Sequence, residues 1–236
     1  NKIKKLYSGR DQIIEGDGIS GSTNTLLRPG LSADTYYLRE WAGVDPDTGA
    51  PQWLTTDANG DRVITKNYAK ADQVALDKRA TPNVFGSFST TLMYKGFDLN
   101  AVFGYSLGAY IYNYSRQEYD ADGAYTDRNQ FSLQKGWKRW KQKGDIATHP
   151  VAAYNNPSNA NKASTRYLES ADFLKLRSVT LGYNFNLKSQ FVKALRVYVS
   201  GENLFCITDY SGVDPELTAA DGGRDASGER STALSI

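Results

Sequence analysis

The sequence is poor in the residues from which most catalytic and metal sites are built. It contains one cysteine, Cys206, and one histidine, His149, among 236 residues. A single cysteine cannot form an internal disulfide, and a lone cysteine in a strand is usually a small apolar residue. A single histidine excludes multi-histidine metal centres and leaves no partner set for a serine or cysteine triad. We therefore expect no enzyme, no metal and no cofactor, and we expect His149, next to Pro150, to be an exposed loop residue.

Long apolar runs are also missing. No stretch reaches the roughly 18 apolar residues that a transmembrane helix needs. A transmembrane β-barrel is still allowed, because its half-polar strands average out as hydrophilic, and the mean hydropathy here is −0.55. The net charge of +2 gives no electrostatic case for binding nucleic acid.

The segment FDLNAVFGYSLG (97–108) shows what the chain does contain, which is strict alternation. A period of two puts successive residues on opposite faces of a β-strand. One face carries Phe97, Leu99, Ala101, Phe103, Tyr105 and Leu107, and the other carries small or polar residues, with Val102 as the exception. The apolar face could contact either the core of a soluble β-sandwich or lipid.

Other segments alternate in the same way. VFGSFSTTLMY (84–94) is separated from 97–108 only by Lys95 and Gly96, so the two form a predicted hairpin. In FLKLRSVTLGYNF (173–185), the simple alternation puts Lys175 and Arg177 on the apolar side. In total, the pattern predicts an all-β, antiparallel protein with strands at about 84–94, 97–111, 172–185, 195–208 and 231–236.

The predicted connections are unequal in length. A tight turn follows Tyr94, whereas 112–166 and 209–230 are long polar loops. Short turns that alternate with long loops are typical of outer-membrane barrels, and soluble sandwiches favour short connections throughout. Aromatic residues gather at the strand ends beside the short turns, as an interfacial girdle requires: Tyr94, Phe97, Tyr183 and Phe185. The pattern favours a barrel, with a soluble, secreted β-sandwich that binds carbohydrate as the alternative.

Three acidic loop motifs resemble calcium loops at first glance: DPDTG (45–49), DANGD (57–61) and YDADG (119–123). In DANGD, Arg62 stands where an EF-hand needs glycine, and no glutamate closes the loop. A hairpin turn at Asn59-Gly60 explains it better.

The segment GWKRWKQKGD (136–145) interleaves aromatic and basic residues. Trp137, Trp140 and Arg139 are candidate contacts for a substrate or a partner, because sugars stack on tryptophan and cations pair with anions. The alternative is that the tryptophans pack the loop onto the rim of the fold while the neighbouring lysines stay solvated.

Five pieces of the sequence occur together in the order of a known family, although no single piece is diagnostic: YYLREWAGVDPDTGAPQW (36–53), TPNVFGSFSTTLMYKGFDLNAVFGYSLGAYIYN (81–113), GWKRWKQKGDIATHP (136–150), STRYLESADFLKLRSVTLGYNFN (164–186) and LRVYVSGENLFCITDYSGVDPE (195–216). In this order they resemble the C-terminal part of SusC/RagA-type TonB-dependent outer-membrane transporters.

The resemblance implies a barrel of about 22 strands in the bacterial outer membrane, filled by an N-terminal plug domain. It implies uptake of oligosaccharides or peptides, a SusD-like surface lipoprotein as a lid, and energy from TonB through an N-terminal box. This chain shows neither plug nor box sequence, so it corresponds to the C-terminal strands, about a quarter of the barrel. On this basis, residues 1–80 form an extracellular loop region with short hairpins and 81–236 form the last strands. The expected lipid-facing residues are Phe97, Leu99, Ala101, Phe103, Tyr105, Val179, Leu181, Tyr183, Leu195, Val197 and Val199.

Overall fold

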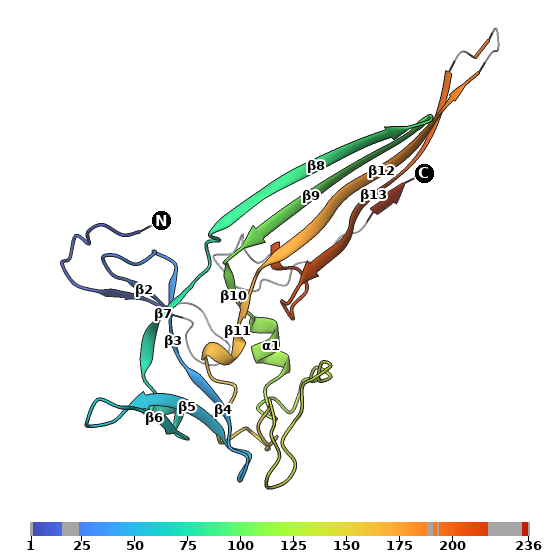
Figure 1. The fold of residues 1–236 in the computed structure, drawn as a ribbon. Helices are drawn as coiled ribbons and strands as arrows, with labels where there is room; N and C mark the ends of the chain where they lie inside the picture. The colour runs from blue at the N-terminus through green and yellow to red at the C-terminus, as the bar shows by residue number, and fades with distance from the viewer. Residues whose placement is uncertain (1, 16–23, 188–190, 193, 217–232, 236) are drawn as a thin grey trace.

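A five-stranded antiparallel sheet of long strands dominates the computed structural model, which describes residues 2–15, 24–187, 191–192, 194–216 and 233–235. Its order is β14-β13-β12-β9-β8. The bounds are Val84–Tyr94 for β8, Phe97–Leu107 for β9, Phe173–Asn186 for β12, Ala194–Thr208 for β13 and Ala233–Ser235 for β14. Figure 1 shows this sheet extending away from the smaller elements, with the β8–β9 turn at its far end. The prediction of an antiparallel β protein is confirmed.

The β8–β9 turn is a two-residue hairpin loop, as the sequence predicts. Tyr94 pairs with Phe97, and the two residues between them, Lys95 and Gly96, have φ angles of 46° and 89°. Positive φ at both positions matches the twist of the flanking strands, and glycine adopts it without steric cost.

The strand register gives the long sheet one apolar and one polar face. Residues directly opposite each other in neighbouring strands lie on the same face. Leu99 of β9 is opposite Leu92 of β8 and Leu181 of β12, and Leu181 is opposite Val199 of β13. One residue further along β9, Asn100 is opposite Thr91 and Thr180. The predicted alternation therefore holds across four strands.

A β-bulge in β12 corrects one expectation. Leu176 pairs with Phe103 and Ser178 with Val102, which leaves Arg177 as an extra residue. The extra residue shifts the two-residue period, so Lys175 lies opposite Gly104 on the polar face rather than on the apolar face. The simple alternation could not show this, because a bulge reverses the facing of every residue beyond it.

The predicted strand 97–111 is interrupted. β9 ends at Leu107, and Gly108 has a φ of 82° and donates its N–H to Asp172 Oδ1 at 2.5 Å. The chain then forms β10 (Tyr110–Tyr112), which pairs with β11 (Leu168–Ser170) in a separate two-stranded sheet. Between them lie α1 (Tyr114–Tyr119) and the 3₁₀ helix η2 (Thr165–Tyr167). No helix in the described ranges is long and apolar enough to cross a membrane.

Two further small sheets precede β8. One has the order β1-β2-β3-β7, with bounds Gln12–Ile14, Asn24–Leu27, Thr35–Arg39 and Gln73–Arg79. The other is β4-β5-β6, with bounds Trp41–Val44, Pro51–Thr56 and Arg62–Thr65, followed by the 3₁₀ helix η1 (Tyr68–Lys70). The main buried apolar cluster lies between these elements and β10–β11, not on the long sheet: Tyr36, Leu38, Tyr112, Ala163, Tyr167 and Leu168.

Candidate functional site

The apolar face of the long sheet is open to the surroundings. Its large side chains are exposed along the whole length of the strands, with Leu92 60%, Val197 53% and Ile207 63% exposed. The other exposed apolar side chains on this face are Val84, Phe88, Tyr94, Phe97, Leu107, Leu181, Phe185, Leu195, Val199 and Phe205. An exposed apolar surface of this extent marks contact with a protein or a membrane.

The residues expected to face lipid share this face by register: Phe97, Leu99, Ala101, Phe103, Tyr105, Val179, Leu181, Tyr183, Leu195, Val197 and Val199. They are not equally accessible. Ala101 is only 6% exposed, because its methyl group lies between larger neighbours such as Val179 and the stacked pair Phe88 and Phe103, whose ring centroids are 4.9 Å apart. The surface at position 101 is therefore made by neighbouring side chains.

An aromatic cluster closes this face at the short-turn end. The ring of Tyr183 lies 4.6 Å from that of Phe97 and 4.6 Å from that of Phe185. Tyr94, opposite Phe97, is 69% exposed. Aromatic residues gathered at one height on strand ends are the arrangement of an interfacial girdle.

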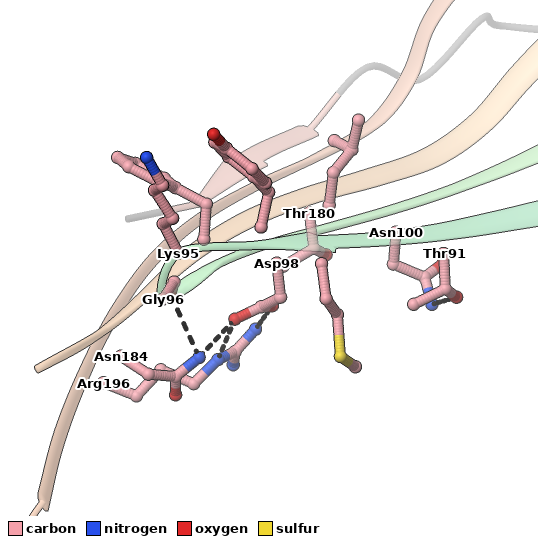
Figure 2. A pocket seen from close by; sticks show the side chains of 12 residues that line it. Thr91, Lys95, Gly96, Asp98, Asn100, Thr180, Asn184 and Arg196 are labelled. Atoms are coloured by element: carbon pink, nitrogen blue, oxygen red, sulfur yellow. Dashed lines mark hydrogen bonds and ion pairs between the residues drawn. The ribbon is translucent and has the colours of Figure 1, made fainter. Parts of the chain in front are cut away.

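The opposite face of the sheet is mostly polar, although Phe85, Met93 and Tyr198 also lie on it, and it holds an ion pair near the same end. Arg196 Nη2 lies 2.5 Å from Asp98 Oδ2, and Asn184 Nδ2 donates to Asp98 Oδ1 at 2.8 Å. Figure 2 shows these three side chains converging below the strands, with Asn100 and Thr91 further along the pocket that all five residues line. Polar groups in this number on one face, with apolar groups on the other, suit a sheet that separates water from hydrocarbon.

A buried ionic cluster holds the region between β10 and β11 together. Asp122 is fully buried and pairs with Arg166, also buried, and with Arg139, whose Nη1 lies 2.5 Å from Asp122 Oδ1. His149 is fully buried as well, and its Nε2 lies 2.7 Å from Asp120 Oδ2. The expectation that His149 is an exposed loop residue is therefore wrong. Its burial depends on tertiary packing against Asp120, about which the local sequence carries no signal.

Burial and the neighbouring charges shift the pKa values of Asp120 and Tyr167 in this cluster. Burial alone would raise the pKa of Asp120, but the hydrogen bond with His149 and the charge of Arg166 more than offset it, so the pKa is lowered. Burial raises the pKa of the Tyr167 hydroxyl, so this tyrosine stays neutral beside the arginines. The anions and cations of the cluster pair with one another within the chain, which points to a structural role.

The three candidate contact residues in the segment 136–145 all contact the chain itself. Trp140 packs its ring against Gly49 and donates its Nε1–H to the Pro46 carbonyl at 2.9 Å. Trp137 lies between His149, at 5.0 Å between ring centroids, and the guanidinium of Arg116, at 4.3 Å. Arg139 belongs to the ionic cluster. These contacts match the packing alternative, and a role in partner or substrate contact stays a prediction.

The acidic motifs are engaged by groups of the chain. Asp57 Oδ1 accepts from the Asn59 and Asp61 N–H groups in the β5–β6 turn, so DANGD forms the expected hairpin turn. In DPDTG, hydrogen bonds from Lys66 and Thr48 lower the pKa of Asp45 to about 2. Within the described ranges, no group of three or more His, Cys, Asp or Glu side chains could hold a metal ion.

Comparison with known proteins adds evidence of a different kind. No family model matches the chain. TonB-dependent receptor P3 of Formosa agariphila is 27% identical over 237 residues, covering 92% of this chain and 22% of that protein. TonB-dependent receptor SusC of Bacteroides thetaiotaomicron is 27% identical over 228 residues, covering 92% of this chain and 21% of that protein. The chain therefore spans about a fifth of the length of these curated relatives.

A solved structure has the same fold. The RagAB peptide importer in the closed-closed state matches with a TM-score of 0.75 at 26% identity, covering 99% of this chain and 25% of that one. The agreement extends over the long sheet and the smaller elements together. Over most of its length, the chain is homologous to TonB-dependent receptors of the SusC/RagA type, which are transporters and not enzymes.

Proposed function

We propose that this chain forms part of the wall of a TonB-dependent importer in the bacterial outer membrane. The observation that carries the proposal is the exposed apolar face that continues across β8, β9, β12 and β13, with a hydrophilic face behind it. In a closed transmembrane barrel, the apolar face contacts lipid and the polar face lines the lumen.

The dimensions support this arrangement. β9 has 11 residues, and at about 3.4 Å per residue with a tilt of about 45° it spans roughly 26 Å along the membrane normal. That is close to the ~25 Å apolar band of such barrels. The cluster of Phe97, Tyr183 and Phe185 then lies at the periplasmic interface, and the small sheets lie on the extracellular side.

The imported nutrient and the partners are carried over from the family. We propose import of oligosaccharides or peptides, with a SusD-like surface lipoprotein as the lid and TonB as the source of energy. The similarity to SusC and to the RagAB peptide importer supports the class of activity.

The soluble alternative is a β-sandwich that binds carbohydrate. Such a fold needs a second sheet packed about 10 Å from the apolar face. Within the described part of the chain, the apolar side chains of β8 and β13 remain 38% to 63% exposed at positions such as Leu92, Val197, Val199 and Ile207, so nothing there covers them. This observation favours the barrel.

Partitioning of the complete gene product tests the proposal. Cells are broken, membranes are pelleted, and the pellet is extracted with detergent. We expect the protein in the detergent extract, and we expect its band to shift on heating before denaturing electrophoresis, as folded barrels do. A soluble monomer in the supernatant would contradict the proposal and support the sandwich.

A further inference from the structure

The segment that follows β13 folds back over the polar face of the long sheet. Lys175 Nζ lies 2.8 Å from Asp214 Oδ2 and 3.1 Å from Glu216 Oε2. The Lys175 side chain is 7% exposed and that of Asp214 is 3% exposed. Because Lys175 is on the polar face, opposite Gly104 and Cys206, residues 214–216 lie against that face.

A third ion pair, made by a second cation of β12, strengthens the attachment. Arg177 Nη2 lies 2.5 Å from Glu216 Oε1, so two cations of β12 meet two anions of the segment. The guanidinium of Arg177 occupies the space where a side chain at position 104 would stand, and Gly104 leaves that space free. The bulge at Arg177 is what directs Lys175 to this face.

Separate contacts anchor the start of the segment. Tyr210 is buried with Ala109, Ile111 and Ala171. The N–H and hydroxyl of Ser211 both donate to the Glu169 carboxylate, each at 2.8 Å. The segment is thus held at two places, by an apolar anchor at Tyr210 and by charges at residues 214–216.

The segment also forms one wall of a cleft. Residues 211–213 line a cavity of about 320 Å³ whose other walls come from the region before β11. The facing residues are Asn113, Ser115, Arg116, Phe131, Ser132, Gln134 and Trp137. A movement of Gly212 and Val213 therefore changes the size of this cleft.

Buried charges add little net free energy to a contact that stays closed. Removing both charges from water costs about as much as their attraction returns, and a well-packed apolar pair of the same size is often as stable or more so. Charged partners have an advantage where a contact separates, because both become well solvated when apart, whereas apolar partners would be left exposed to water.

From this geometry we propose that residues 209–216 are an ionic latch. It is anchored at Tyr210 and closed by Lys175 and Arg177 of β12 through Asp214 and Glu216. Closed, it narrows the space over the polar face at the loop end of the sheet. Separation of the ion pairs swings residues 212–216 away from the sheet, about the anchor at Tyr210 and Ser211, and opens the cleft. The identification of that space as the lumen rests on the proposed function, whereas the latch itself rests on the contacts.

The test measures the position of the segment in the complete receptor. In a Cys206→Ser background, spin labels are placed at Val213→Cys and Phe85→Cys, whose side chains are 56% and 75% exposed. Phe85 shares the polar face of the sheet with Asp98 and Met93, since it lies opposite Ser106. We expect Lys175→Met to lengthen and broaden the distance between the labels, and we expect the exchange of Lys175→Asp with Asp214→Lys to restore it.

The matched control is Arg196→Met, which breaks the Asp98 ion pair at the other end of the same face and should leave the distance unchanged. An unchanged label distance in Lys175→Met overturns the latch. A lengthened distance also overturns it if the charge exchange does not restore the distance, or if Arg196→Met lengthens it as well. If Lys175→Met does not fold, the double variant Asp214→Asn and Glu216→Gln, which removes both anions of the segment, is measured instead: a lengthened distance supports the latch and an unchanged distance overturns it. Recovery of the receptor as a soluble protein would contradict the proposed function. The label distance would still test the latch, because the latch rests on the contacts alone.

Discussion

Ala101 of β9 and Val179 of β12 lie directly opposite each other near the middle of the apolar face. In a barrel this height corresponds to the midplane of the membrane. An arginine there costs roughly 2–4 kcal/mol. We predict that Ala101→Arg lowers the free energy of unfolding of the complete receptor in lipid far more than Asn100→Arg, whose side chain lies on the polar face of the sheet. Urea unfolding in liposomes measures both.

The same position separates lipid from a packed protein core. Ala101→Leu adds volume that extends outward from the sheet. A second protein layer would resist it by about 1–3 kcal/mol, whereas fluid lipid accommodates it. We predict a change close to zero for Ala101→Leu, and marked destabilisation would contradict contact with the membrane.

The β8–β9 turn depends on backbone conformation. Gly96, with φ at 89°, lies close to the ring of Tyr183. We predict that Gly96→Ala destabilises the receptor by about 1–2 kcal/mol, the cost of forcing a residue with a Cβ into the left-handed region. Lys95→Asn is the control, because asparagine adopts positive φ readily and should be neutral or slightly stabilising. Equal effects of the two substitutions would argue against this origin.

The hydrogen-bonded pair His149 and Asp120 stabilises the packing of the region 113–163. His149→Ala leaves the Asp120 carboxylate without this partner at a buried position, which costs about 1–3 kcal/mol. We predict faster cleavage of this region by an added protease in the complete receptor. Lys143→Ala is the matched control, because the Lys143 side chain is 80% exposed and its ion pair with Asp47 is long, at 3.9 Å between Nζ and Oδ1. Cleavage of His149→Ala at the rate of the unmodified protein would contradict a structural role for the histidine.

Acid should loosen the β4–β5 hairpin in a narrow window. The pKa of Asp45 is lowered to about 2, against about 3.9 in an unfolded chain. A depressed carboxyl pKa stabilises the folded state fully above the unfolded pKa, and this contribution is lost as the pH falls toward the folded value. We predict that pepsin cuts the unmodified hairpin faster at pH 2 than at pH 4, relative to cuts elsewhere, and that Asp45→Asn removes this difference.

The sequence was sufficient for the long strands and for the two faces of the sheet, because both follow from a period of two. It was not sufficient for the bulge at Arg177, since a single extra residue leaves no composition signal and yet moves Lys175 to the other face. The break after Leu107 depends on Asp172, which is far away in the chain. Likewise, the burial of His149 and the ion pair between Arg139 and Asp122 arise from contacts between residues that are distant in the sequence. Of the candidate site, the apolar face was therefore predictable, and the ionic cluster and the latch were not.

The most direct test of the central claim compares two neighbouring positions on β8. Leu92 lies on the apolar face and Thr91 on the polar face. Each is replaced by cysteine in a Cys206→Ser background of the complete receptor, spin-labelled and reconstituted in lipid. We predict that the label at Leu92→Cys is relaxed mainly by oxygen, which dissolves in hydrocarbon, and the label at Thr91→Cys mainly by a water-soluble nickel chelate. Equal access of the nickel chelate to both labels, or stronger access at position 92, would contradict the claim that this face of the sheet contacts the membrane.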